Sequence, residues 1–253
     1  MTARGRPPGP FERLVILGES TVQGGGWVAS DAERYADILW KLIETAQEEP
    51  LEYFNAGVGG SVISPASPGY AASGKPSAAE RLDQHVIRRD PDLLVIAYGL
   101  NDMRAGMPVA DFRNELLKIL DRVQVAVNPA IVLVNVYYMP DFPHFAPFDR
   151  GSTEATRAYN RMLRKLAEER GLVYADVYSA EADCPYVVNV DGVHANKIGN
   201  MLIAHRVFEA IVRGCPGIAR NVARRDETSD WTKHIRRLLA AEHKSQGTSR
   251  PGP

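Results

Sequence analysis

Cysteine and long apolar runs are nearly absent from this sequence. Only two cysteines, Cys184 and Cys215, occur among its 253 residues. They lie far apart and match no metal-ligand spacing, so the sequence predicts neither a disulfide framework nor a metal site. No run of about 18 apolar residues occurs, so we expect no transmembrane helix. Residues 1–10 hold arginines and prolines without an apolar segment, so we expect no signal peptide and a cytoplasmic protein.

The chain also lacks an excess of charge of either sign. Its formal net charge is −1, so no overall basic field indicates a nucleic-acid partner. Phosphate-binding signatures are missing as well. The cluster Gly24-Gly25-Gly26 is followed by no Gly-Lys-Ser/Thr, and no Gly-x-Gly-x-x-Gly stands at a strand end. These absences argue against a P-loop and against a dinucleotide-binding fingerprint.

What the sequence does contain is an alternation of short apolar runs and helical patterns. Strands are predicted at 13–17, 51–54, 93–98, 130–137 and 172–177. Helices are predicted at 31–48, 78–88, 109–125, 153–170 and 196–213. Parallel strands need crossover helices, so this alternation predicts an α/β fold, a three-layer α/β/α sandwich around a mostly parallel five-stranded sheet.

The composition divides the chain into three parts. Residues 1–12 are rich in Pro and Gly and are expected to be irregular, and residues 13–216 hold the alternating pattern of one domain. Residues 217–253 are predicted to form one amphipathic helix near 231–241 and a polar tail. The segment 61–77, rich in Ser, Pro, Gly and Ala, predicts a long loop. Such loops in compact domains are often functional, and a lid is one hypothesis.

Polar and glycine residues stand just after the predicted strands. Ser20 follows the first strand, Gly60 the second and Asn101 the third, whereas Asp191 and His194 follow the fifth. The carboxyl ends of parallel strands meet at one edge of a sheet, where such folds bind their ligands. We therefore expect these five residues to lie close together.

This set of residue types matches the chemistry of acyl transfer. A serine hydroxyl is a poor nucleophile until a base takes its proton, and His194 is the candidate base, oriented by Asp191. The backbone N–H groups of Ser20 and Gly60 and the amide of Asn101 are candidate donors to an oxyanion. Taken singly, each residue has a plain structural reading: a helix cap, a turn or a hydrogen-bonded histidine. Their joint order favours a serine hydrolase.

The residues also fall into four sequence blocks. These are Gly18-Glu19-Ser20, Asn55-Ala56-Gly57-Val58-Gly59-Gly60, Gly99-Leu100-Asn101-Asp102 and Asp191-Gly192-Val193-His194. The set resembles the SGNH hydrolase superfamily, also called the GDSL esterases and lipases. That family has a Gly-Asp-Ser, an Asn-x-x-x-x-Gly, a Gly-x-Asn-Asp and an Asp-x-x-His in the same order. The resemblance covers most of residues 13–213 and implies the flavodoxin-like SGNH fold.

The resemblance also implies roles and points of difference. Ser20 would be the nucleophile and an oxyanion donor, Gly60 and Asn101 further oxyanion donors, His194 the base and Asp191 its orienter. No metal or organic cofactor would be needed. The family's Asp before the serine is Glu19 here, and Thr21 stands in place of Leu. Gly59 beside Gly60 leaves the second donor open by one position.

An aromatic, proline-rich loop at 138–149 predicts one wall of a substrate pocket, since such pockets are mainly apolar and aromatic. Its candidate substrate-binding residues are Tyr138, Phe142 and His144. We expect a serine esterase that hydrolyses the oxygen ester of a small molecule, such as an acetylated sugar or a secondary metabolite. No nucleic-acid or membrane partner is expected. The alternatives are an acyltransferase using the same site, and a catalytically inactive domain that binds carbohydrate or a protein partner.

Overall fold

The computed structural model describes residues 9–143 and 145–247, with side chains described up to residue 242. The strands are β1 Arg13–Gly18, β2 Glu52–Gly57, β3 Leu93–Ala97, β4 Ala130–Val134 and β5 Val173–Ala175. The longer helices are α2 Tyr35–Gln47, α4 Ala78–His85, α6 Val109–Ala126, α7 Thr153–Arg170, α9 Lys197–Gly214, α10 Arg220–Thr228 and α11 Asp230–Gly247. The shorter ones are α1 Ser20–Gln23, α3 Tyr70–Ser73, α5 Leu100–Arg104 and α8 Val177–Glu181. Within the described residues, no helix is long and apolar enough to cross a membrane.

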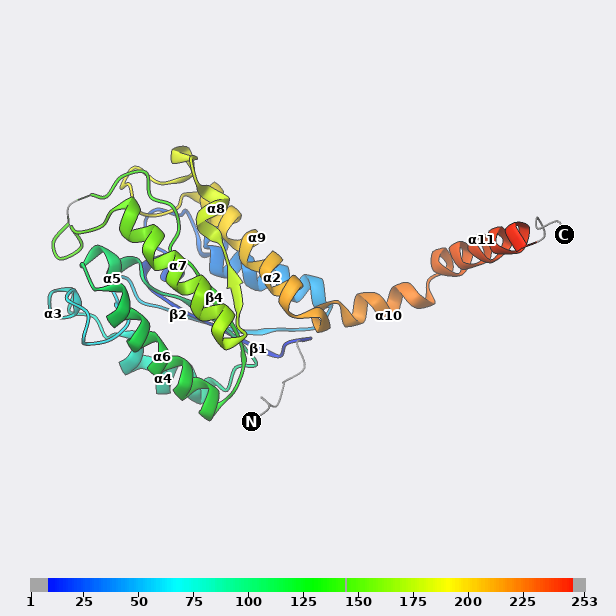
Figure 1. The fold of residues 1–253 in the computed structure, drawn as a ribbon, viewed down its shortest axis with the longest axis horizontal. Coiled ribbons are helices and arrows are strands. Elements are labelled where there is room, and N and C mark those ends of the chain that lie inside the picture. Colours follow the sequence, from blue (N-terminus) through cyan, green and yellow to red (C-terminus); the bar gives the residue numbers. More distant parts are fainter. Residues whose placement is uncertain (1–8, 144, 248–253) are drawn as a thin grey trace, which may run out of the picture.

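The five strands form one sheet in the order β2-β1-β3-β4-β5, and every neighbouring pair is parallel. Helices α2 and α9 lie side by side on one face, and α4, α6 and α7 cover the other (Figure 1). This confirms the predicted three-layer α/β/α sandwich. The chain leaves β1 toward one edge and β3 toward the other, so a crevice forms beyond their carboxyl ends. The residues after β1 and β3 are those around Ser20 and Asn101.

The central strands are apolar throughout because helices cover both faces. Leu14 to Leu17 in β1 and Leu93 to Ile96 in β3 are almost completely buried. The following helices begin at defined caps. The Ser77 hydroxyl accepts the Glu80 N–H at 3.4 Å, and the Glu80 carboxylate accepts the Ser77 N–H at 2.8 Å. This reciprocal pair fixes the start of α4 after the long loop.

Two strands are shorter in the structure than the sequence predicted. β4 ends at Val134 rather than at Tyr137, and β5 ends at Ala175 rather than at Val177. The physical reason lies in the side chain of Asn135. Its Oδ1 accepts the backbone N–H of Val177 at 2.8 Å and that of Tyr178 at 3.1 Å, so α8 begins where the strand was expected to continue.

Other element boundaries also differ from the prediction. The helix predicted from residue 31 begins as a 3-10 turn at Asp31–Glu33, and α2 starts only at Tyr35, because the backbone of Arg34 is extended. The predicted loop 61–77 contains the short helix α3. At the N-terminus, residues 9–12 lie outside helices and strands, as expected, whereas residues 1–8 lie outside the described residues.

The tail forms two helices, α10 and α11, where one helix near 231–241 was predicted. Ser229 separates them with an extended backbone, φ −65° and ψ 149°. Its hydroxyl accepts the Thr232 N–H at 3.1 Å and so caps α11. Both helices extend away from the sandwich (Figure 1).

Gly57 ends β2 directly against the backbone of α1, the helix that begins with Ser20. A Cβ atom at Gly57 would lie 2.2 Å from the Gln23 nitrogen and 2.7 Å from the Val22 carbonyl carbon. Backbone cannot yield as a flexible side chain can, so we expect Gly57→Ala to lower the free energy of unfolding by roughly 1–3 kcal/mol. Gly26→Ala is the control, since nothing lies within 4 Å of a Cβ atom there. Equal urea midpoints for the two variants would contradict this prediction.

Candidate active site

Ser20, His194 and Asp191 form a continuous hydrogen-bonded chain at the carboxyl edge of the sheet. The Ser20 Oγ lies 2.9 Å from the His194 Nε2, and the His194 Nδ1 lies 2.6 Å from the Asp191 Oδ2. Ser20 opens α1 directly after β1, whereas the turn from Asp191 to His194 precedes α9. The fold thus brings together residues that the sequence separates by more than 170 positions.

The carboxylate of Asp191 is held by the turn that it begins. Its Oδ1 accepts the backbone N–H groups of Val193 and His194, both at 2.9 Å. Burial opposes ionisation of Asp191, but these backbone hydrogen bonds and the bond from the imidazole outweigh it and lower the pKa of the carboxyl. The charged carboxylate therefore faces the Nδ1 side of the ring and favours the tautomer that carries its proton there.

The surroundings of His194 favour its neutral imidazole. Burial lowers the pKa of His194 below its ordinary value of 6.5, and the positive charge of Arg104 adds to this effect. The carboxylate of Asp191 opposes the shift without cancelling it. In this neutral form, with the Nδ1 proton facing Asp191, Nε2 can accept the hydroxyl proton of Ser20.

The predicted oxyanion donors can be compared by whether their N–H groups already have a partner. Gly60 has a φ of +75°, a conformation that favours glycine. Among the hydrogen bonds between residues 9–143 and 145–247, none involves the N–H of Gly60 or that of Ser20. The Gly59 N–H, in contrast, donates to the Gln23 Oε1 at 2.5 Å. Of the two adjacent glycines, Gly60 is therefore the one whose N–H is available to a ligand.

Asn101 is buried at the start of α5, directly after β3. Its Nδ2 donates to the Ser61 carbonyl oxygen at 2.9 Å. An amide nitrogen carries two hydrogens, so this bond fixes the side chain and leaves a second N–H for a ligand. The role of Asn101 as an oxyanion donor stays a prediction.

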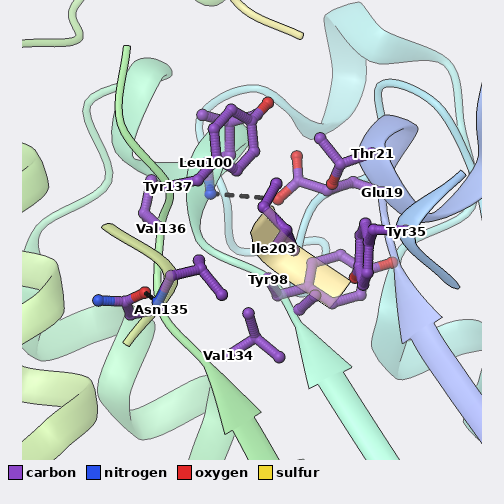
Figure 2. A pocket seen from close by; sticks show the side chains of 12 residues that line it. Glu19, Thr21, Tyr35, Tyr98, Leu100, Val134, Asn135, Val136, Tyr137 and Ile203 are labelled. Carbon is purple, nitrogen blue, oxygen red and sulfur yellow. Dashed lines mark hydrogen bonds between the residues drawn. The ribbon is translucent and has the colours of Figure 1, made fainter. Parts of the chain in front are cut away.

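Glu19, directly before the serine, connects the end of β1 to the start of α5. Its carboxylate accepts the backbone N–H of Leu100 at 3.1 Å and that of Asn101 at 3.2 Å, and Figure 2 shows the first of these bonds. Burial and the nearby charge of Asp102 raise the pKa of Glu19, although both backbone bonds oppose the shift. The side chain faces a small internal cavity that Tyr35 also lines (Figure 2). Glu19 therefore holds the segment that carries Asn101.

Trp27 is the site residue that the sequence prediction missed. Its indole stacks on the His194 ring with centroids 3.7 Å apart and planes 8° from parallel. The glycine cluster before it allows this position, because a Cβ atom on Gly25 would lie 2.3 Å from the indole Cζ3. Three glycines directly before a tryptophan were the available signal.

The predicted pocket loop lies beside the Asp191–His194 turn. A Cβ atom on Gly192 would lie 3.6 Å from the Pro143 Cδ, and the Arg104 Nη2 donates to the Pro143 carbonyl at 3.2 Å. Phe142 packs inward against the core, and Tyr138 contacts Tyr178 edge to face at 6.0 Å. His144 lies outside the described residues. The substrate-binding roles of Tyr138, Phe142 and His144 remain predictions.

The parallel five-stranded sandwich, with the Ser20–His194–Asp191 chain at its carboxyl edge, defines an SGNH-type hydrolase. The sequence profile of the GDSL-like Lipase/Acylhydrolase family matches residues 16–202. The chain belongs to this family, as its four blocks predicted. No curated protein sequence matches the chain.

Solved structures share the fold at low sequence identity. Axe2, an acetylxylan esterase from Geobacillus stearothermophilus, is 19% identical with a TM-score of 0.60, over 79% of this chain and 94% of that one. LAE5, an alpha/beta hydrolase enzyme from the metagenome of Lake Arreo in Spain, is 19% identical with a TM-score of 0.61, over 79% and 95%. TesA is 16% identical with a TM-score of 0.63, over 80% and 99%.

Proposed function

We propose that the chain is a serine esterase that hydrolyses an oxygen ester through an acyl-enzyme. The observation that carries this proposal is the pair of hydrogen bonds from Ser20 through His194 to Asp191, at 2.9 Å and 2.6 Å. A serine bonded to a neutral imidazole, itself oriented by a carboxylate, is the arrangement that activates a hydroxyl as a nucleophile.

In the first half of the reaction, the Ser20 Oγ attacks the ester carbonyl carbon while His194 Nε2 takes the hydroxyl proton. The carbonyl electron pair moves to oxygen and forms the oxyanion. When the tetrahedral intermediate collapses, the C–O bond to the alcohol breaks, and the imidazolium gives its proton to the leaving oxygen. The products are the free alcohol and an ester on Ser20.

In the second half, a water molecule takes the place of the alcohol. His194 removes a proton from the water as its oxygen attacks the acyl carbon, and then returns the proton to the Ser20 Oγ. The acid leaves and the serine is regenerated. In both halves, the N–H groups of Ser20 and Gly60 and the amide of Asn101 donate to the oxyanion, where preorganised donors have their largest effect.

We propose a short acyl group on a small alcohol, such as an acetylated sugar, as the substrate. The acetylxylan esterase among proteins of the same fold supports this choice. The test compares kcat/KM for p-nitrophenyl acetate, butyrate and octanoate, followed by acetate release from acetylated oligosaccharides. Acetate should be the preferred acyl group. No turnover of any ester by the folded protein would contradict an esterase and favour a binding domain.

The same site, if it excluded water, would transfer the acyl group to another alcohol. The two reactions are separated by adding an acceptor alcohol to the p-nitrophenyl acetate assay and measuring free acetate and new ester. We expect free acetate to remain the main product. New ester as the main product would replace the hydrolase with an acyltransferase.

The pH dependence follows from the lowered pKa of His194. The base works only when unprotonated, so kcat/KM should be level near pH 7 and fall as pH decreases through that pKa. Since burial places the pKa below 6.5, the midpoint of this fall should also lie below pH 6.5. Circular dichroism at each pH checks that the fold persists. A midpoint at or above pH 7 would contradict the assignment of His194.

Trp27 should act as a positioning residue for the base. Removing the ring stacked on His194 with Trp27→Ala frees the imidazole to rotate, and small misplacements of a catalytic group cost about 10- to 100-fold in rate. The loss should appear in kcat, with KM little changed. Trp27→Phe retains a stacking ring and should recover most of kcat. An unchanged kcat in Trp27→Ala would show that the stack has no positioning role.

A further inference from the structure

Helix α11 carries an apolar stripe that is open to solvent. Trp231, Leu238 and Leu239 are 69%, 53% and 52% exposed. Together with Ile235 they recur at the i, i+4, i+7 and i+8 spacing that places side chains on one helix face. Figure 1 shows α11 projecting away from the sandwich. An exposed apolar face on a helix of 18 residues is typical of an interaction surface.

The sandwich carries a matching apolar surface on the outer side of α2 and α9. A groove of about 620 Å³ runs along α2 and reaches Phe208 of α9. Its apolar lining residues are Ala32, Ile38, Trp40, Leu42, Ala46 and Phe208. Met201 and Val212 are exposed and lie on the same face of α9 as Phe208, seven residues before it and four after it. They extend the apolar surface along α9.

We propose that a second copy of this chain fills the groove, with α11 of each protomer lying along α2 and α9 of its partner. The lengths agree: α11 and α9 each have 18 residues, or about 27 Å, and α2 has 13, or about 20 Å. One chain supplies both the helix and the groove. A two-fold dimer therefore buries both apolar surfaces twice and closes the assembly.

The C-terminal helices and the rest of the chain carry net charges of opposite sign. Residues 217–253 carry eight Lys or Arg and four Asp or Glu. The whole chain has a formal net charge of −1, so the remaining residues carry an excess of negative charge. On α11, Lys233, Arg236 and Arg237 lie opposite the apolar stripe by their spacing. When the stripe is docked, these basic side chains face away from the groove. The opposite net charges of the arm (α10 and α11) and of the rest of the chain therefore favour the encounter of two copies at long range, whereas the apolar stripe and groove supply the contact.

The groove of the same chain is a less suitable site for α11. Helix α10 is attached to the C-terminal end of its own α2, where the Asn221 Nδ2 donates to the Gln47 carbonyl at 2.8 Å and Arg225 pairs with Glu48. From there α10 and α11 run away from the body (Figure 1). The arm therefore reaches outward, toward a neighbouring molecule.

The oligomeric state tests this proposal first. Light scattering after gel filtration at micromolar concentration should give twice the chain mass. Leu238→Glu on the arm and Phe208→Glu in the groove should each halve that mass. Val125→Glu, at an exposed apolar residue of α6, is the matched control and should remain a dimer. Circular dichroism confirms folding. A monomeric wild type, or dimers in both arm and groove variants, would overturn the proposal.

Cysteine cross-linking then identifies the contact. Leu238→Cys and Leu42→Cys are prepared separately in a Cys184→Ser background, mixed and oxidised. A disulfide-linked dimer that forms only in the mixture supports the exchange of arms, and its absence overturns it. An internal disulfide in a monomeric double variant would assign α11 to its own groove. Flotation of a monomer with phosphatidylserine vesicles would assign α11 to a lipid surface. Either result would also overturn the proposal.

Discussion

Ser20→Ala should lower kcat for p-nitrophenyl acetate by at least about 10⁴-fold, because the variant retains the donors but has no nucleophile. The Ser20 Oγ, which lies 2.9 Å from the His194 Nε2, is the atom that forms the ester bond with the acyl group. The substitution removes one buried oxygen without adding bulk. The thermal midpoint should therefore stay close to that of the wild type.

The neighbouring hydroxyl of Thr21 provides the control for Ser20→Ala. It follows Ser20 in the same helix, α1, but it is not bonded to His194. Thr21→Ala should retain kcat within about tenfold, since it leaves the nucleophile, the base and the three donors in place. Equal losses in the two variants would show that α1 is only disturbed, and the nucleophile would have to be sought elsewhere.

Asn101→Ala should have the second largest effect, a loss of about 10²- to 10³-fold in kcat with little change in KM. The amide is proposed to donate to the oxyanion, which exists in the transition state and not in the bound ester. Its bond to the Ser61 carbonyl, at 2.9 Å, holds the donor in place before the substrate arrives. Asn101→Asp should be at least as harmful, because a carboxylate repels the negative charge that develops there.

A double variant separates catalysis by Asn101 from a structural role. The rate that remains without the nucleophile comes from the oxyanion donors and from substrate binding, so Ser20→Ala with Asn101→Ala should be slower than Ser20→Ala alone. The free energies of unfolding of the two single variants should add. A double variant as fast as Ser20→Ala would contradict Asn101 as an oxyanion donor.

The sequence predicted the order of the elements and the position of the site better than the element ends. Apolar runs such as Leu93 to Ile96 identify a strand covered on both faces. The spatial order of the strands, β2-β1-β3-β4-β5, was not predicted and comes from the structure. The end of β4 depends on the Asn135 side chain, which bonds residues over 40 positions away. Such long-range bonds leave no periodic signal in the sequence.

Within the site, sequence blocks named residues but not their partners. They could not separate Gly59 from Gly60, because the difference lies in the Gln23 side chain that occupies one N–H. Glu19 replaces the family's Asp, and the sequence did not show the effect of this difference. The structure shows that its carboxylate accepts the N–H groups of Leu100 and Asn101. Trp27 reaches His194 only because the chain turns back at the glycine cluster.

The most direct test of an activated Ser20 is the intact mass of the protein after treatment with a fluorophosphonate. The hydrogen bond to an unprotonated His194 predicts one covalent adduct on the wild type and none on Ser20→Ala. A folded wild type that stays unmodified, or an adduct on both proteins, would contradict Ser20 as the nucleophile.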